Sequence, residues 1–468
     1  MNTIITNNII IYKPNRAILD WMEKNLKVNN PTYQTMKLLG KEDNIKRCHI
    51  PELLYLYSQR GDYYFLPSGC LFPLWNEIKT DYYEVKLNDC GFNSIKNSKP
   101  TNPLYDYQER AVQNMLAAKS GILVAQCAAG KTYMGIEIIR RIGKKALWLV
   151  HTGDLLNQAK EDMLEQYPTA KIGLTTKGKL EIGEDITIST IQTMDKIDPN
   201  LYKNEFDIVI CDECAHVAGS PTQMKMFQRI ISNIPARYKF GLTATPFRSD
   251  GMIKSMYAYI GLSPSGLFEP TYKIDRSEVK TMPSIHTRVN IESGYDDDKL
   301  YELYDASGMM SYTLLINNLC ENDERTEKIL ENVKKCAAEG RKQVLLSGRV
   351  SHCEKIVEML QNMGYNAILC VGKVSDKKRK EILSDAKKWD ILVATYSLLK
   401  EGVSINELDT LHLITPVKDK AIVIQSAGRI ERYLEGKKQP IVYDYVDTDI
   451  PYCVKAFSTR KSALRKRF

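Results

Sequence analysis

The sequence predicts an α/β protein with two tandem domains, each a doubly wound parallel sheet, that follow a small α+β accessory domain. Three observations support this. Short apolar runs alternate with longer helical stretches over residues 103–278, the alternation returns over 279–468, and the first hundred residues mix short apolar clusters with polar turns. Strands that alternate with helices are typical of parallel sheets. We therefore expect an accessory domain at 1–100 and α/β domains at 101–280 and 281–468.

Composition and charge limit the class of protein. The 468 residues are enough for about three domains. A net charge of +8 permits a polyanionic partner without requiring one. No apolar run approaches the ~20 residues of a membrane span, and MNTIITNNIIIYKPNR at the N-terminus lacks the features of a signal peptide. Eleven cysteines without a framework indicate reduced thiols, so we expect a cytoplasmic protein.

The accessory domain carries no nucleotide signature but is rich in aromatic residues with basic residues between them. This mixture is found on surfaces that bind nucleic acid. Aromatics buried in an ordinary core would give the same composition, so both interpretations stay open. The residues concerned are Tyr55, Tyr57, Tyr63, Tyr64, Phe65, Phe72, Tyr82, Tyr83, Lys41, Lys46, Arg47 and Arg60. Residues 93–102, with two serines and a proline, indicate a linker.

The first α/β domain contains five apolar runs that have the length of buried strands. These runs are 122–124, 146–150, 186–189, 208–211 and 239–242, with periodic helical segments between them. Ligands of such sheets bind at the carboxyl ends of the strands. The residues whose side chains can take part in ligand binding or catalysis follow these runs.

Residues 121–132, GILVAQCAAGKT, are the stretch around which this domain is organised. An apolar run, a turn of small residues, Lys131-Thr132 and a helical pattern follow one another. A P-loop requires that order, because small residues let backbone N–H groups surround phosphate oxygens at a helix N-terminus. Lys131 is expected to reach the β and γ phosphates, and Thr132 to hold Mg²⁺. Ala125 replaces the opening glycine of the general pattern, and Ala128 replaces an inner glycine, which stiffens the loop.

Two adjacent carboxylates follow the run 208–211 in the sequence IVICDECAH. Asp212 supplies the hard oxygen ligand that Mg²⁺ on a nucleoside triphosphate needs. Glu213 fits the base that positions an attacking water, and His216 can link the γ-phosphate to neighbouring residues. A surface turn would give the same short pattern, but its pairing with an upstream P-loop favours the nucleotide interpretation. We interpret the two flanking cysteines as thiols packed beside the site rather than as metal or redox groups.

Two further segments end in polar residues that suit the same site. In GLTATPFR, Thr243 and Thr245 can form hydrogen bonds across a nucleotide. In QSAGRIER, Arg429 and Arg432 are expected on one helix face, because they lie three residues apart. From a second domain, two such arginines can reach a γ-phosphate and stabilise transition-state charge. An exposed helix with ordinary arginines would be the alternative.

The second α/β domain repeats the scheme without a second P-loop. Its predicted strands are 343–347, 366–371, 390–394, 410–414 and 440–445. The join between the domains is expected near 281–293, and residues 294–339 are expected to be helical. The many charges of 373–388 are typical of a solvated helix face. The basic tail 460–468 can contact phosphate, or it can be a frayed terminus.

The order of these motifs resembles that of superfamily-two helicases of the DExH kind. The motifs are YQ at 107–108, AQCAAGKT at 125–132, VHT at 150–152, ISTIQT at 188–193, DECAH at 212–216, LTATP at 242–246, ATYSLLKEGVS at 394–404 and QSAGRIER at 425–432. LTATPFR and the segment LLSGRVSHCE at 345–354 are most similar to phage UvsW-type and related viral DNA helicases. The resemblance covers roughly residues 103–450 and implies two RecA-like domains.

The resemblance also implies roles for individual residues. Gln108 is expected to recognise adenine, which makes ATP with Mg²⁺ the expected nucleotide, and Gly402 to approach it from the second domain. Ala128, Ala129 and Gly130 would surround the phosphates, Thr243 and Thr245 would couple nucleotide state to domain movement, and Gln425, Arg429 and Arg432 would complete the site across a cleft. The residues expected along one nucleic-acid strand, mainly at phosphates, are His151, Thr152, Thr190, Gln192, Ser347, Arg349 and Thr395. Ser404 stands where such helicases often have an acid.

The implied function is an ATP-dependent DNA helicase or translocase that separates strands or remodels branched DNA in recombination, repair or replication. Its expected partner is branched, forked or single-stranded DNA, and it is expected to act as a monomer, in the host cytoplasm if the chain is viral. Two alternatives stay open. An RNA helicase would share every catalytic residue, and an ATP-gated nucleic-acid clamp would bind ATP with little turnover. A nuclease or restriction subunit is disfavoured, because no separate carboxylate cluster with lysine lies outside the ATPase motifs.

Overall fold

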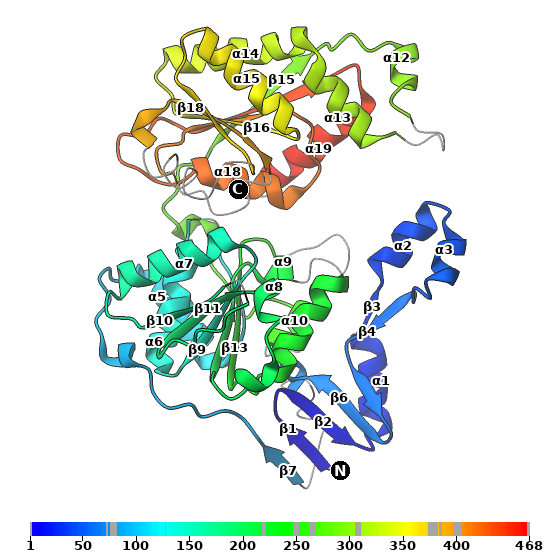
Figure 1. Ribbon diagram of the computed structural model, residues 1–468, viewed down its shortest axis with the longest axis vertical. Helices are drawn as coiled ribbons and strands as arrows, with labels where there is room; N and C mark the ends of the chain where they lie inside the picture. The colour runs from blue at the N-terminus through cyan, green and yellow to red at the C-terminus, as the bar shows by residue number, and fades with distance from the viewer. Residues whose placement is uncertain are drawn as a thin grey trace. The chain divides into compact units, whose positions relative to one another are not determined.

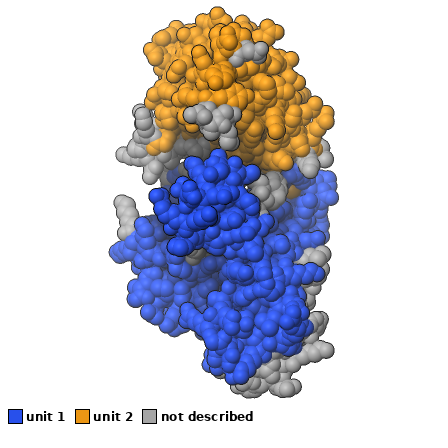
Figure 2. Space-filling view, turned by 90° about the vertical axis from the view of Figure 1, so that its right-hand side faces the viewer, with its two compact units in different colours: residues 1–278 blue, residues 279–468 orange. Residues whose placement is uncertain are grey.

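The computed structural model consists of two compact units, residues 1–278 and 279–468 (Figures 1 and 2). It describes residues 2–71, 74, 82–126, 128–176, 178–217, 221–246, 252–261, 268–304, 310–372, 382, 386–396 and 405–465. Each unit contains a parallel sheet with helices on both faces, so the predicted fold class of two doubly wound α/β domains is confirmed. Within the described ranges, no helix is long and apolar enough to cross a membrane.

The first unit contains a seven-stranded parallel sheet with the order β10-β11-β9-β12-β13-β8-β14. The strands are β8 (Ser120–Val124), β9 (Ala146–Val150), β10 (Ile172–Thr175), β11 (Ile186–Thr190), β12 (Ile208–Cys211), β13 (Tyr238–Thr243) and β14 (Tyr272–Lys273). All five predicted strands are present, and β10 and β14 are additional. Because β9 and β12 are buried along their whole length, they read in the sequence as continuous apolar runs.

Two groups of helices cover this sheet (Figure 1). One group is α5 (Asp106–Ala118), α6 (Lys131–Ile142) and α7 (Gly153–Gln166). The other is α8 (Ile191–Met194), α9 (Cys214–Val217), α10 (Pro221–Asn233) and α11 (Ile253–Ile260), with short 3₁₀ turns η3 (Pro199–Leu201) and η4 (Arg276–Glu278) nearby in the chain. Gly135 of α6 permits the close approach of Trp148, since a Cβ there would lie 2.6 Å from the indole ring.

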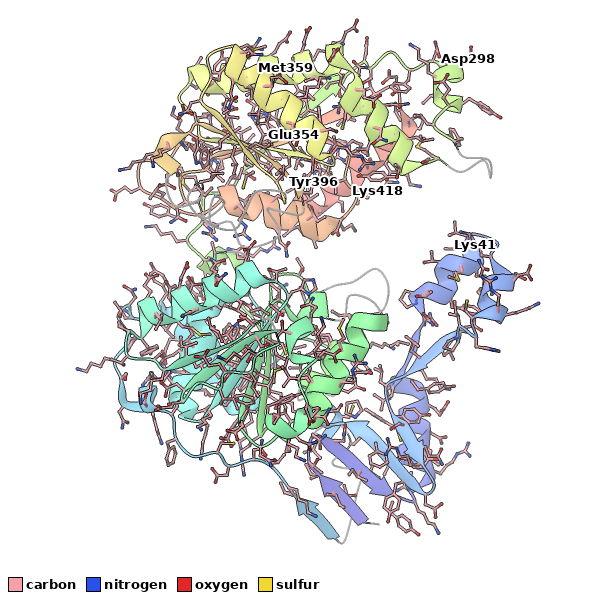
Figure 3. The ribbon with its side chains drawn as sticks, viewed as in Figure 1. Lys41, Asp298, Glu354, Met359, Tyr396 and Lys418 are labelled. Atoms are coloured by element: carbon pink, nitrogen blue, oxygen red, sulfur yellow. The ribbon has the colours of Figure 1, made fainter. Side chains whose placement is uncertain are left out.

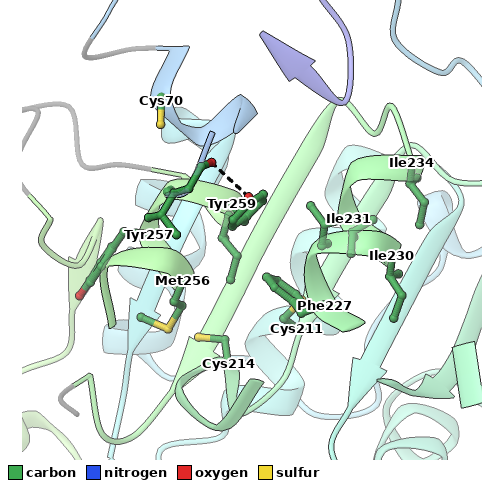
Figure 4. Packing of buried hydrophobic residues seen from close by; sticks show 14 of the residues in the cluster. Cys70, Cys211, Cys214, Phe227, Ile230, Ile231, Ile234, Met256, Tyr257 and Tyr259 are labelled. Atoms are coloured by element: carbon green, nitrogen blue, oxygen red, sulfur yellow. Dashed lines mark hydrogen bonds between the residues drawn. The ribbon is translucent and has the colours of Figure 1, made fainter. Parts of the chain in front are cut away.

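Residues 2–97 form the predicted α+β region. Its sheet has the order β5-β6-β2-β1-β7. The elements are β1 (Asn2–Ile5), β2 (Asn8–Tyr12), α1 (Arg16–Asn25), β3 (Lys27–Asn29), α2 (Pro31–Leu38), α3 (Glu42–Arg47), β4 (Leu53–Tyr55), β5 (Ser58–Arg60), β6 (Tyr63–Pro67), η1 (Ser68–Cys70), β7 (Tyr82–Val85) and η2 (Ser94–Asn97). Its core is continuous with that of the first α/β sheet: Tyr259 of α11 donates a hydrogen bond to the carbonyl of Leu56 at 3.2 Å (Figure 4).

Some aromatic residues of this region pack in the core, and others are exposed, as a nucleic-acid surface would require. Tyr57 and Tyr64 pack against the buried core. Tyr55 and Tyr63 are exposed, by 50% and 47%. Phe72 and the side chains of Tyr82 and Tyr83 lie outside the described residues.

The segment 93–102 differs from the expected linker, because it is fastened to the first α/β sheet. Asn93 donates to the carbonyl of Lys144 at 2.9 Å, and Ser94 donates to Asp185 at 2.8 Å. These hydrogen bonds fix the position of a segment whose composition predicts a linker.

The second unit contains a six-stranded parallel sheet with the order β15-β20-β19-β16-β18-β17. The strands are β15 (Ile285–Ile291), β16 (Gln343–Ser347), β17 (Ala367–Cys370), β18 (Ile391–Thr395), β19 (Thr410–Leu413) and β20 (Ile441–Asp447). The helices are α12 (Asp297–Tyr301), α13 (Tyr312–Glu321), α14 (Asp323–Ala338), α15 (Val350–Asn362), η5 (Ala386–Lys388), α18 (Lys420–Ile430) and α19 (Pro451–Arg465). Glu354 and Met359 mark α15 in Figure 3.

Two expectations for this unit need correction. The expected join at 281–293 contains β15, which pairs in parallel with β20 from Ile285 to Ile291. The basic tail is helix α19 as far as Arg465, and its Arg460 is 1% exposed and paired with Asp444 at 2.6 Å. Most of the predicted charged helix face at 373–388 lies outside the described residues.

Candidate nucleotide site and nucleic-acid residues

The three nucleotide motifs of the first unit lie at the carboxyl ends of neighbouring strands. Strand β13 lies between β12 and β8, with Gly241 opposite Cys211 and Thr243 opposite Val124. The P-loop follows β8, the two carboxylates follow β12, and Thr245 follows β13. Since parallel strands end at one edge of the sheet, these residues meet at the ligand-binding edge.

The P-loop turns through backbone conformations that favour glycine. Gly130, the N-cap of α6, has φ +76°, and a Cβ there would lie 2.4 Å from Nε2 of Gln108. Ala128 has φ +68°, in the left-handed region that costs an L-residue about 1–2 kcal/mol. Ala129 is buried between them. The turn places Lys131 and Thr132 in the first turn of α6, where N–H groups are available to phosphate.

Gln108 connects the start of α5 to this loop. Its Oε1 accepts from the backbone N–H of Tyr105 at 3.0 Å, and its Nε2 donates to the carbonyl of Ala129 at 2.9 Å. The Tyr107 hydroxyl donates to the same carbonyl at 3.3 Å. No sequence pattern indicates a role for Tyr105, which the structure places beside this loop. Its ring is 69% exposed and stacks on that of Tyr107 with centroids 5.9 Å apart, so a flat aromatic surface lies beside Gln108.

Lys131 and the two carboxylates meet at this edge. Nζ of Lys131 lies 3.3 Å from Oε1 of Glu213, and Oδ1 of Asp212 accepts from the backbone N–H of Glu213 at 2.9 Å. Glu213 has φ +47°, an uncommon conformation for a residue with a side chain and one that occurs at functional sites. Burial, together with the neighbouring charge of Glu213, raises the pKa of the Asp212 carboxyl to about 7.

This donor set fits a divalent cation. Asp212 is 7% exposed, and its pKa is raised because the carboxylate is buried beside a second anion. A bound cation would stabilise the ionised carboxylate and lower this pKa again. Asp212 and Thr132 are the oxygen donors that would hold Mg²⁺. Among the described residues, no group of three or more His, Cys, Asp or Glu side chains is suited to a metal, so the proposed donors are one carboxylate and one hydroxyl together with the nucleotide.

A hydrogen bond also links the two threonines at the end of β13. Thr243 and Thr245 are buried, and Oγ1 of Thr243 accepts from the N–H of Thr245 at 3.1 Å. His216 lies in α9, but its side chain is outside the described part of the chain. Burial raises the pKa of the flanking Cys211 and Cys214 thiols, so both are neutral packing groups at ordinary pH.

The predicted nucleic-acid residues of the first unit follow a different pair of strands at the same edge. His151 and Thr152 follow β9, Thr190 is the last residue of the neighbouring β11, and Gln192 follows it. All four are half-buried. The hydroxyls of Thr152 and Thr190 already accept hydrogen bonds as the N-caps of α7 and α8. The two sets of motifs therefore occupy separate halves of one edge.

In the second unit, Ser347 and Thr395 end neighbouring strands β16 and β18 opposite each other. Ser347 is fully buried, and its Oγ lies 3.0 Å from Nδ1 of His352. The Arg349 guanidinium is held by Oδ1 of Asn317 at 2.6 Å. Gly402 and Ser404 lie outside the described residues. The predicted contacts of Ser347 and Arg349 thus concern side chains that already have partners within the fold.

The predicted arginine pair is placed differently from the expectation. Gln425 and Arg429 lie in α18, where Gln425 is 5% exposed. The helix ends at Ile430, so Arg432 does not share its face as predicted. After the helix, Arg432 forms an antiparallel bridge with Thr281, and the Glu431 carbonyl accepts from the N–H of Met282 at 2.8 Å. Pairing with the segment before β15 ends the helix early.

Two family models match the chain. Residues 101–248 match the model of the type III restriction enzyme res subunit, and residues 324–433 match the helicase conserved C-terminal domain. Together they span the P-loop, the two carboxylates, and the segment with Gln425 and Arg429.

Relatives with similar sequences carry helicase names. One from Acanthamoeba polyphaga mimivirus, provisionally named an ATP-dependent RNA helicase, is 24% identical over 417 residues, 88% of this chain and 76% of that protein. The ATP-dependent DNA helicase UvsW of Enterobacteria phage T4 is 26% identical over 358 residues, 73% of this chain and 68% of that protein. The solved structure of S. cerevisiae Dbp5 bound to RNA and ADP BeF3 has a TM-score of 0.55 at 13% identity, covering 76% of this chain and 87% of that one, and supports the tandem fold.

Proposed function

Because this chain belongs to the superfamily-two helicases and is an ATP-hydrolysing helicase, we propose that it is a DNA motor. In this proposal, ATP hydrolysis drives strand separation or the remodelling of forked and other branched DNA, in recombination, repair or replication. The T4 relative, whose name specifies DNA, supports this choice. The mimivirus relative, whose name specifies RNA, makes an RNA helicase the second candidate.

One observation carries the proposal: Nζ of Lys131 lies 3.3 Å from Oε1 of Glu213 at the ligand-binding edge. A P-loop cation is thereby next to a carboxylate that can position water. We propose that Lys131 and the Gly130 turn bind the phosphates of ATP. Glu213 orients the attacking water and accepts its proton. Mg²⁺, held by Asp212 and Thr132, would neutralise charge on the phosphate oxygens.

The proposed coupling involves both units. Gln425, Arg429 and Arg432 belong to the second unit, and we propose that they stabilise charge on the phosphoryl group that is transferred at the P-loop of the first unit. Thr243 and Thr245 lie between the strands that carry the P-loop and the carboxylates, which supports their proposed role in sensing nucleotide state.

Nucleic acid is proposed to contact the half of the edge that follows β9 and β11. His151, Thr152, Thr190 and Gln192 offer polar side chains there, which we propose contact phosphates. We therefore propose weak sequence preference and strong dependence of binding on salt concentration. Monomeric action and a cytoplasmic location stay predictions.

The decisive experiment measures ATPase and strand displacement on linear duplex, forked and four-way DNA and on matched RNA. Wild type is compared with Glu213→Gln and with Glu358→Gln, an exposed glutamate of α15 that serves as the control. We expect stimulation by branched DNA, loss of turnover in Glu213→Gln and no change in the control. Stimulation by RNA alone would assign the RNA helicase. Equal, unstimulated rates in wild type and Glu213→Gln would assign the ATP-gated clamp.

A further inference from the structure

A two-helix arm extends from the accessory region (Figure 1). Its stalk is the antiparallel pair β3 and β4, and its tip is the pair of short helices α2 and α3 with the turn between them (residues 31–50). Figure 3 marks Lys41 at this tip. We call residues 27–55 the arm.

The stalk is firmly anchored. Val28 is 5% exposed and joins the buried core at the root of the arm. At the start of the tip, Asn30 is 4% exposed: its Nδ2 donates to the carbonyl of Pro51 at 2.8 Å, and its Oδ1 accepts from the N–H of Thr32 at 3.0 Å. The first bond joins the two sides of the stalk and the second caps α2, so the tip begins at an ordered position.

The tip has no buried residue from position 31 to position 50. Leu38 is 84% exposed and Leu39 is 44% exposed, and they precede Gly40, which turns with φ +64° and would have no atom within 4 Å of a Cβ. Fully burying one leucine side chain is worth roughly 1.5–3 kcal/mol, so two adjacent exposed leucines at the end of an arm indicate a contact with something outside the fold.

The charges of the tip favour an anionic partner. Four basic residues, Lys37, Lys41, Lys46 and Arg47, accompany two acidic residues, Glu42 and Asp43. A protein groove that receives a helix needs an apolar stripe at positions i, i+3, i+4 and i+7. Leu38 and Leu39 are adjacent and form no such stripe. Apolar side chains with flanking cations are instead the means by which proteins insert between base steps of a duplex.

From this geometry we infer that the arm tip binds nucleic acid where a duplex ends or opens. Leu38 and Leu39 pack on the face of the last base pair, and the flanking lysines contact the backbone phosphates on either side. The inference deepens the proposed motor function and rests on it for its role: the arm is the element that the advancing enzyme presses against the junction.

The test uses the whole chain with the double substitution Leu38→Ser, Leu39→Ser. The matched control is Leu201→Ser, a leucine of η3 that is 60% exposed in the same unit. Because all three leucines are exposed, the melting temperature should not fall. On forked DNA we expect displacement by the double variant to slow by about ten-fold, a change of roughly 1.4 kcal/mol. Its ATPase on single-stranded DNA and the activity of the control should match wild type.

A second readout needs no ATP. With 2-aminopurine in the last base pair of the fork, wild type and Leu201→Ser should change its fluorescence, and the double variant should not. Lys37→Glu with Lys41→Glu should weaken fork binding and reduce its salt dependence, whereas Lys24→Glu, at an exposed position of α1, should not. If the double leucine variant displaced strands and changed the fluorescence as wild type does, the inference would be overturned. If wild type showed neither ATPase nor strand displacement, the proposed motor function would be refuted instead. The fluorescence measurement would then still show whether the arm tip contacts the last base pair.

Discussion

The ammonium group of Lys131 lies 3.3 Å from the carboxylate of Glu213, and the two side chains are 12% and 17% exposed. The residue predicted to bind phosphate therefore also neutralises the residue predicted to orient water. Removing Lys131 would leave Asp212 and Glu213 as adjacent anions in a poorly solvated position, which raises the pKa of Asp212 further and removes the cation that binds phosphate.

We therefore expect Lys131→Met to lower the ATPase rate by about 100-fold or more. Because the two residues act as a unit, the double variant with Glu213→Gln should be little worse than either single variant. Steady-state ATPase at saturating DNA measures all three, with Lys335→Met, an exposed lysine of α14, as the control. Multiplicative losses in the double variant would show that the ion pair does not join their functions.

Ala128 offers a stability prediction, because its φ of +68° suits glycine better than alanine. Ala128→Gly should raise the free energy of unfolding of the first unit by about 1 kcal/mol. The opposite sign is expected for Ala117→Gly, an exposed position within α5, where glycine costs about 1 kcal/mol. Urea denaturation of both variants beside wild type measures the difference. Destabilisation by both would mean that the left-handed turn is not strained in alanine.

The sequence indicated most of the sheet but not its half-exposed strands. The runs 208–211 and 343–347 match β12 and β16 to the residue, because every residue of both strands is buried and their central residues are apolar. Strand β15 reads IHTRVNI and is exposed or half-buried except at Ile291, so it lacks that signal. Its place in the sheet depends on pairing with β20, which is distant in the chain.

The candidate site shows the same division. Motif spacing identified Lys131, Asp212 and Glu213, which lie together, because strand-end motifs in a parallel sheet converge whatever their separation in sequence. The end of α18 before Arg432 could not be read from the sequence, since no glycine or proline marks it and the cause is the bridge to Thr281. Likewise, no sequence pattern near the basic tail indicates that Arg460 pairs with the buried Asp444.

That buried partner yields a third prediction. Arg460 is 1% exposed and lies 2.6 Å from Asp444, which is itself fully buried, so Arg460→Met would leave this carboxylate in the core with the His286 imidazole, whose Nε2 lies 3.0 Å away, but without the guanidinium. Breaking such a pair typically costs about 3–5 kcal/mol. We expect a loss of that size in the second unit, and almost none for Lys461→Met, its half-buried neighbour. Thermal denaturation compares them. Normal stability with weakened DNA binding would restore the phosphate-contact interpretation of the tail.

The last prediction concerns Lys239 of β13, which is 3% exposed and lies with its Nζ 2.7 Å from the Ser68 hydroxyl. Burial lowers its pKa to about 7, whereas the unfolded chain titrates near 10.4, so between these values the unfolded state binds more protons and stability rises with pH. Relative to Lys239→Met, wild type should gain up to about 1.4 kcal/mol per pH unit from pH 7 to 10. Thiols that ionise on unfolding affect both proteins equally and cancel in this difference. Urea midpoints at four pH values measure it, and parallel curves would mean that Lys239 stays charged in the folded protein.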